Sequence, residues 1–97
     1  MPIASPRYAF NRTMVSGAPP DPGVFALWEG EELIYYGRAQ SIQARLQEHL
    51  ERNHSCTARA THYGWEIAGN PALRESELLR EYRRATGRLP RCNAATA

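Results

Sequence analysis

The sequence predicts a small α/β domain of the α+β type, in which a three-stranded antiparallel sheet is flanked by helices in the order β-β-α-β-α. Two short apolar and aromatic runs stand on either side of a polar, glycine-containing turn, which indicates a hairpin. Two later segments repeat apolar residues every three or four positions, as amphipathic helices do, and an alternating run lies between them. The 97 residues are enough for one such domain.

Residues 1–22 are predicted to form an arm or loop, because proline, glycine, serine and alanine dominate them up to the segment SGAPPDPG. Tyr8 and Phe10 are expected to pin this arm onto the domain. The domain itself is assigned to 23–93, and 94–97 are expected to form a frayed tail.

The hairpin is predicted to consist of Gly23–Trp28 and Glu32–Gly37, with Gly30 in the turn. A short turn predicts two facing pairs, Leu27 with Leu33 and Phe25 with Tyr35. Because side chains alternate along a strand, these four side chains should share one face and the even-numbered ones the other. Both faces are apolar, so we expect each to be covered.

The first helix is predicted to run from Ser41, whose hydroxyl can cap the opening turn, to about Arg52. Its buried stripe is predicted to comprise Ile42, Leu46 and Leu50, which repeat every four residues.

A third strand is predicted within 59–67, where aromatic and apolar residues alternate with smaller or polar ones. A second helix should begin at Asn70 and Pro71 and stop at Gly87. Its apolar face is predicted to consist of Leu78, Leu79, Tyr82 and Ala85. The following segment, RLPRCN, is expected to be extended.

Glu75 projects onto the apolar face of the second helix, whereas Glu77 points elsewhere. A carboxylate on a buried stripe must be paired, bound to a metal or close to water, because burying it alone is costly. Alternatively, Glu75 lies in an open first turn, where the helix dipole favours an acid.

The composition is compatible with nucleic-acid binding without demanding it. The formal net charge is +2, and all twelve basic residues are arginine, which binds phosphate through two parallel N–H donors. The two cysteines, Cys56 and Cys92, fit neither a disulfide framework nor a zinc motif, and free thiols indicate a cytoplasmic location. No apolar run is long enough for a signal peptide or a membrane span.

Taken together, several of these positions resemble the signature of the GIY-YIG nuclease family. The two halves of that signature appear as Gly23–Phe25 and Tyr35–Gly37. The remaining matches are the helical arginine and histidine of the family on Arg45 and His49, its metal-binding glutamate on Glu75, and its Pro-x-x-Asn motif on Pro90 to Asn93. The resemblance covers about 22–93.

The resemblance implies a metal-dependent endonuclease that hydrolyses DNA phosphodiester bonds in repair, recombination or restriction. The implied cofactor is Mg²⁺ or Mn²⁺. The implied partner is DNA rather than a membrane, with specificity supplied by DNA shape, a homodimer or a partner protein.

The resemblance also implies a role for each matching residue. Glu75 would anchor the metal, and Tyr35 would act as the general base or relay to it. Arg45 would donate to the reacting phosphate. We expect these groups and an imidazole to line one cleft.

Four further residues have supporting roles in this interpretation. Arg38 stands where DNA-repair members carry a lysine and would contact a flanking phosphate. Gly37 beside it would also contact nucleic acid, because a glycine lets the backbone come close. His49 would bond to the Tyr35 hydroxyl or accept its proton. Asn93 would orient Glu75 or bridge to a water on the metal.

Phe25 departs from the family pattern, because it replaces the first signature tyrosine and removes a hydroxyl. Two alternatives to an active nuclease therefore stay open. One is a nucleic-acid-binding module with weakened or lost catalysis, and the other is an interaction domain of a larger assembly. Singly, each candidate residue also has an ordinary explanation, such as a half-buried sheet aromatic for Tyr35.

Overall fold

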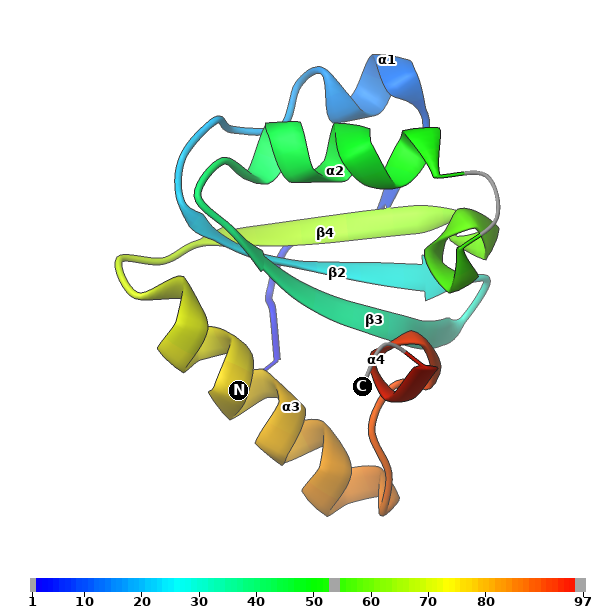
Figure 1. The fold of residues 1–97 in the computed structure, drawn as a ribbon, viewed down its shortest axis with the longest axis vertical. Helices are drawn as coiled ribbons and strands as arrows, with labels where there is room; N and C mark the ends of the chain where they lie inside the picture. Colours follow the sequence, from blue (N-terminus) through cyan, green and yellow to red (C-terminus); the bar gives the residue numbers. More distant parts are fainter. Residues whose placement is uncertain (1, 53–54, 96–97) are drawn as a thin grey trace.

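A computed structural model describes residues 2–52 and 55–95, which form one four-stranded antiparallel sheet with helices on both faces (Figure 1). The spatial strand order is β1-β4-β2-β3. The elements in chain order are β1 (Tyr8–Ala9), α1 (Arg12–Val15), β2 (Gly23–Glu29), β3 (Glu32–Ala39), α2 (Ile42–Glu51), the 3-10 helix η1 (Cys56–Arg59), β4 (His62–Ile67), α3 (Pro71–Thr86) and α4 (Arg91–Ala95).

The predicted α+β class and the order β-β-α-β-α are present in this structure as β2, β3, α2, β4 and α3. The prediction of three strands was wrong, because the N-terminal arm adds β1 as a fourth. Strand β1 has only two residues, which is too short for the alternation of apolar and polar residues that identifies a strand in a sequence.

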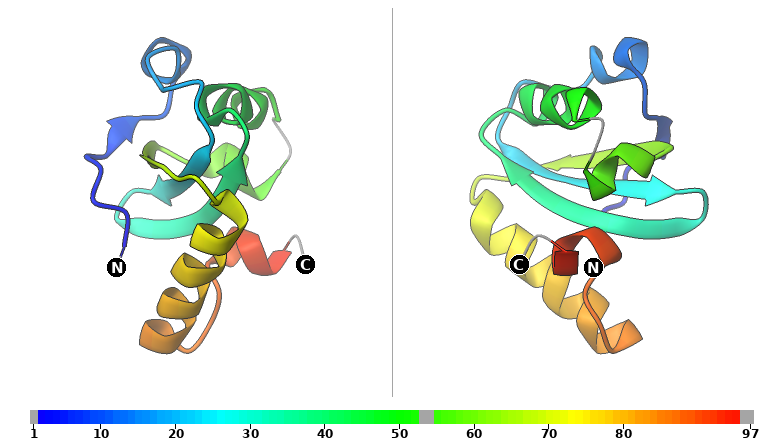
Figure 2. Two further views of the ribbon diagram at one scale, coloured as in Figure 1. Left: turned by 90° about the vertical axis from the view of Figure 1, so that its left-hand side faces the viewer. Right: turned by 45° about the vertical axis from the view of Figure 1, so that its right-hand side comes forward.

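Both faces of the sheet are covered, as the apolar pattern of the hairpin predicted. Helices α1 and α2 lie over one face and α3 over the other (Figures 1 and 2). Ile42 and Leu46 of α2 are fully buried in the first core, and Leu78 of α3 is buried in the second. The sheet therefore separates two small apolar cores, each with its own helix.

The predicted register of the hairpin was wrong by two residues, of which a bulge accounts for one. Leu27 pairs with Tyr35 and Trp28 with Leu33, so Ile34 is an extra residue in β3. The bulge transfers Ile34 to the α2 side and leaves Leu33 against the α3-side core. Phe25, Leu27 and Tyr35 still share the α2 face, so the inner face of the signature tyrosine was predicted correctly.

The two long helices begin where the capping residues predicted. The Ser41 hydroxyl accepts a hydrogen bond from the Ala44 N–H, at 3.2 Å. The Asn70 side chain accepts from the Leu73 N–H, also at 3.2 Å, and Gly87 ends α3 with a φ of 81°. In contrast to the predicted apolar face, Ala85 is exposed, because α3 extends past the end of the sheet contact.

The N-terminal arm is an integral part of both cores. Tyr8 pairs with Tyr63 across β1 and β4, and Val15 of α1 is fully buried. Before β1 the chain passes to the opposite side of the sheet, where Ile3 packs on the α3-side core (Figure 2). Tyr8 and Phe10 pack on the α2-side core, as expected for residues that pin the arm.

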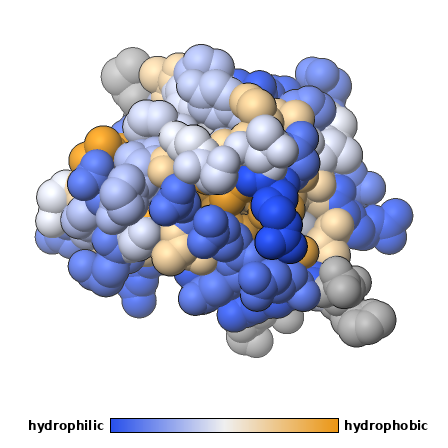
Figure 3. Space-filling view, turned by 90° about the horizontal axis from the view of Figure 1, so that it is seen from above, coloured by the Kyte–Doolittle hydropathy of each residue, from blue (hydrophilic) through white to orange (hydrophobic). Residues whose placement is uncertain are grey.

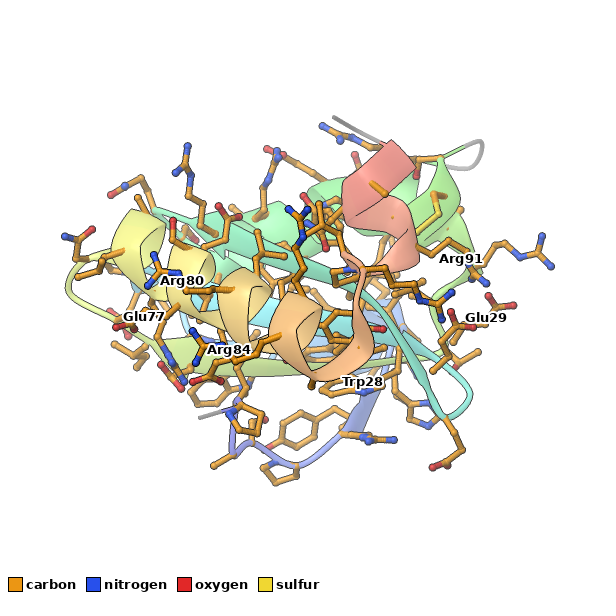
Figure 4. All side chains as sticks on the ribbon, turned by 90° about the horizontal axis from the view of Figure 1, so that it is seen from below. Trp28, Glu29, Glu77, Arg80, Arg84 and Arg91 are labelled. Atoms are coloured by element: carbon orange, nitrogen blue, oxygen red, sulfur yellow. A yellow bond between two sulfur atoms is a disulfide. The ribbon has the colours of Figure 1, made fainter. Side chains whose placement is uncertain are left out.

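Helix α4 (Arg91–Ala95) takes in the second half of the segment RLPRCN, so the prediction of an extended segment was wrong for that half. Arg91 of this helix pairs with Glu29 of the hairpin (Figure 4). It also pairs with Glu32. The predicted tail at 94–97 begins inside this helix, and its last two residues lie outside the described part of the chain.

Cys56 of η1 and Cys92 of α4 form a disulfide, with their Cα atoms 5.5 Å apart. The prediction of free thiols was therefore wrong, and the inference of a reducing cytoplasm loses its basis. The two cysteines are 36 residues apart, a separation that gives no signal in sequence.

Seen from the α1 and α2 side, the surface is mostly hydrophilic, with small apolar areas between polar side chains (Figure 3). Within residues 2–52 and 55–95, no helix is both long and apolar enough to cross a bilayer.

The disulfide gives a prediction for stability. In the double variant Cys56→Ser/Cys92→Ser, the unfolded chain gains the freedom of an open loop of 36 residues. We expect the free energy of unfolding, measured by urea denaturation, to fall by about 4 kcal/mol. As a control, a reducing agent should destabilise the wild type and leave the double variant unchanged. Equal stability of oxidised and reduced wild type would contradict the prediction.

Candidate active site

A cleft of about 680 Å³ lies between the end of β3 and the start of α3 and reaches the side of α2. Its lining residues are Tyr35, Arg38, Ala39, Gln40, Arg45, Asn70, Pro71, Ala72 and Glu75. Four of the predicted site residues, the phenol, two arginines and the carboxylate, are thus brought together from three elements. Gln40 and the helix-opening residues 70–72 complete the wall without having been predicted as site residues.

Glu75 is held in place by the way α3 begins. The Asn70 cap and Pro71 at the first helical position fix where the helix starts. Arg74 then binds Glu66 of β4 through two hydrogen bonds, of 2.6 and 3.2 Å, and thereby fixes the rotation of the helix against the sheet. The next residue, Glu75, therefore faces the cleft.

The Glu75 carboxyl is in a partly desolvated position. Its side chain is 22% exposed, and burial raises its pKa above the ordinary value, an effect that nearby Arg38 opposes. Arg38 Nη1 lies 3.9 Å from Glu75 Oε1, and the Arg38 side chain is 58% exposed. The pair is loose, so an incoming cation or phosphate can separate it at little cost.

Arg45 projects from α2 into the same cleft. Its Nη1 is 2.7 Å from Glu48 Oε1, three residues further along the helix, in an exposed ion pair. Such a pair contributes little to stability, so the guanidinium can exchange Glu48 for a phosphate.

The Tyr35 side chain lies between two hollows. It lines the main cleft, and with Arg45 it also lines a smaller pocket of about 230 Å³ formed by α2 and η1. The expectation that the imidazole would share the main cleft was wrong, because His49 belongs to this smaller pocket.

His49 is almost completely buried, with 3% of its surface exposed. Its ring packs against the rings of Phe25 and Tyr35, with centroids 5.5 and 5.4 Å away. Its Nδ1 lies 2.9 Å from Thr57 Oγ1, while its buried Nε2 has no hydrogen-bond partner among residues 2–52 and 55–95. Burial, with smaller effects from Arg45 and Arg52, lowers the pKa of His49 from 6.5 to about 4, so the ring is neutral at pH 7.

The second signature glycine has a packing role. A Cβ on Gly37 would lie 2.4 Å from an atom of the Phe25 ring and 2.8 Å from an atom of the Tyr35 ring. The missing side chain lets both rings pack closely against β3. Gly37 is buried there, so the structure gives the glycine a packing role, and its contact with nucleic acid stays a prediction.

Phe25 is fully buried beneath the site. Its ring contacts Tyr35 and His49 and closes the floor under both, at centroid distances of 6.0 and 5.5 Å. The residue therefore retains the packing function of an aromatic at this position and lacks the hydroxyl.

Asn93 lies beside β3 rather than in the cleft wall. Its Oδ1 accepts from the Tyr36 N–H and its Nδ2 donates to the Tyr36 carbonyl, each at 2.9 Å. The side chain thus extends the hydrogen bonding of β3 by one unit at the outer edge of the sheet. In this position it supports the strand that carries Tyr35.

Two comparisons by sequence give no match for the chain. No protein-family model matches it. No curated protein matches it either.

The structure, in contrast, is similar to solved structures of the GIY-YIG N-terminal endonuclease domain of UvrC from Thermotoga maritima. A tyrosine-to-phenylalanine point mutant bound to the catalytic divalent cation has 26% sequence identity and a TM-score of 0.64 over 74% of this chain and 88% of that one. The domain bound to magnesium has 25% identity and the same TM-score over 74% of this chain and 89% of that one.

The chain therefore has the fold of the GIY-YIG nuclease superfamily, and the resemblance seen in its sequence is confirmed. The similarity suggests a nuclease-type function for it.

The buried imidazole gives a prediction for pH dependence. Below pH 6.5 the unfolded chain binds a proton at His49 that the folded chain does not bind until about pH 4. Stability from this residue is therefore present above pH 6.5 and is lost as the pH falls toward 4. Between pH 7.5 and 4.5 we expect the free energy of unfolding, measured in urea, to fall by about 2 kcal/mol more in wild type than in His49→Asn. Equal losses in the two proteins would contradict it.

Proposed function

We propose that the chain is an endonuclease that hydrolyses DNA phosphodiester bonds with Mg²⁺ or Mn²⁺. One observation carries the proposal. A single open cleft gathers the Glu75 carboxylate, the Arg38 and Arg45 guanidiniums and the Tyr35 phenol from three different elements. These are an acid for a hard cation, two donors for phosphate oxygens and a proton-transfer group.

The donor set fits a hydrated magnesium ion held at one point. In the described ranges 2–52 and 55–95, no three His, Cys, Asp or Glu side chains form a metal-binding group. Glu75 alone, partly desolvated in the cleft, would hold the ion, and Mg²⁺ often uses one or two carboxylates with water and phosphate oxygens completing its shell. When bound, the ion supplies positive charge that offsets the charge developing on the phosphate.

The two arginines orient the sugar-phosphate backbone of the DNA. Arg45, released from Glu48, presents two parallel N–H donors to the reacting phosphate, where negative charge accumulates. Arg38 is more exposed and lies at the mouth of the cleft, so it contacts a neighbouring phosphate.

Tyr35 takes up the proton of the attacking water, and His49 supports Tyr35. The Tyr35 hydroxyl, on the wall between the two pockets, deprotonates the attacking water or relays its proton. His49 packs close to Tyr35 and is neutral at pH 7, so it can accept a hydrogen bond from the Tyr35 hydroxyl, whereas its pKa of about 4 makes it too weak a base to hold the proton.

The first test is nicking of supercoiled plasmid. Wild type should nick with Mg²⁺ and not with EDTA. Glu75→Gln removes the metal-binding charge and Arg45→Ala the phosphate donor, and each should lower the rate by about 10²–10³-fold.

Matched controls separate these roles from general loss of charge. Glu77→Gln changes an acid of the same helix that lies in a row with Arg80 and Arg84 along α3 (Figure 4). Arg12→Ala changes an exposed arginine on α1. Both control variants should nick like wild type, and equal losses in Glu77→Gln and Glu75→Gln would overturn the proposed metal site.

Phe25 favours a second candidate function, a DNA-binding module that has lost turnover. A fully buried phenylalanine stands where the signature has a tyrosine. Such a module would bind DNA with a steep salt dependence, and Mg²⁺ would add nothing.

Phe25→Tyr distinguishes the two functions. If the chain is an endonuclease, wild type should nick at a rate within about tenfold of Phe25→Tyr, the value of one hydrogen bond. The same plasmid assay measures both proteins, and a thermal melt checks that the buried hydroxyl is tolerated. An inert wild type with an active Phe25→Tyr would identify the binding module.

A further inference from the structure

The hydrogen bond of His49 belongs to a chain of hydroxyl groups that ends on the backbone. His49 Nδ1 is 2.9 Å from Thr57 Oγ1, and Thr57 Oγ1 is 3.0 Å from Ser55 Oγ. Ser55 Oγ lies 3.2 Å from the carbonyl oxygen of Arg52. Three side chains and one carbonyl are thus connected in a line that leads from the imidazole back to the end of α2.

The carbonyl at the end of the line fixes its direction. A carbonyl oxygen only accepts, so the single Ser55 hydroxyl proton is donated to Arg52. Ser55 Oγ must then accept from the Thr57 hydroxyl, and Thr57 Oγ1 must accept from His49. Every contact is satisfied in this direction only, because each hydroxyl has one proton to give.

We propose that Thr57 and Ser55 are positioning residues that hold His49 as the Nδ1–H tautomer, which leaves the lone pair of Nε2 free to accept a hydrogen bond from the Tyr35 hydroxyl during the reaction. The tautomer itself is inferred from the chain of hydroxyl groups. Its role in catalysis rests on the proposed nuclease function.

Two independent features agree with this assignment. Nε2 is buried without a partner in the described part of the chain, and an unsatisfied buried N–H is rarer in proteins than an unsatisfied acceptor. Thr57 is itself 4% exposed, and the neighbouring Cys56 ties η1 to α4 through the disulfide. The hydroxyl is therefore held at a fixed place relative to the imidazole.

The tautomer is read directly by ¹⁵N–¹H correlation of the imidazole nitrogens in the full chain at pH 7. Wild type and Thr57→Ser should show the proton of His49 on Nδ1. In Thr57→Val, which keeps the shape and removes the hydroxyl, the proton should shift wholly or partly to Nε2. Thr86→Val, far along α3, is the matched control and should leave the His49 signals unchanged. An Nε2–H tautomer in wild type, or an unchanged tautomer in Thr57→Val, would overturn the proposal.

Activity gives the second readout. We expect Thr57→Val to nick plasmid about ten- to a hundredfold more slowly, the usual loss when the partner that orients a functional histidine is removed, and Thr57→Ser to restore the rate. Thermal melts identify any variant that is merely unfolded. Because the tautomer is measured without DNA, an inactive wild type would refute the proposed function while the spectra still decide the role of Thr57.

Discussion

The site depends on the alternation of side chains along β3, an outer strand of the sheet with helices on both of its faces. Tyr35 points to the α2 side, where it meets His49, whereas Tyr36 points to the α3 side and packs near Tyr82. Arg38 follows on the α3 side, close to Glu75. One strand thus supplies groups to both layers, and the cleft opens where these layers meet around its end.

The two guanidiniums of the cleft are held only in exposed ion pairs. Arg45 is paired with Glu48 and Arg38 loosely with Glu75, so neither guanidinium is locked in a buried ion pair. Exposed pairs of this kind are weak, and a phosphate with a cation offers both partners a better one. The buried groups behave differently: His49, Phe25 and Gly37 are fixed by packing, which gives the Tyr35 side of the site a rigid floor.

The features that could be predicted from the sequence are those that depend on neighbouring residues. Ser41 and Asn70 cap their helices through the N–H group three residues further along, so the predicted helix starts were correct. The inward position of Glu75 follows from the start of its helix. Long-range relations were missed. The bulge at Ile34 depends on both strands, the Cys56–Cys92 bridge on elements distant in sequence, and the hydroxyl of Thr57 meets His49 only through the turn of η1. Asn93 matched a motif, yet its side chain bonds to the edge of β3.

That amide has a consequence for how copies of the chain meet. Exposed strand edges invite other chains to add strands, and the two ends of this sheet are poor templates for it. One end is a strand of only two residues, and at the other the Asn93 amide occupies both the donor and the acceptor of Tyr36. Sheet extension between molecules is thereby discouraged, and with it the fibre-like assembly that open strand edges permit.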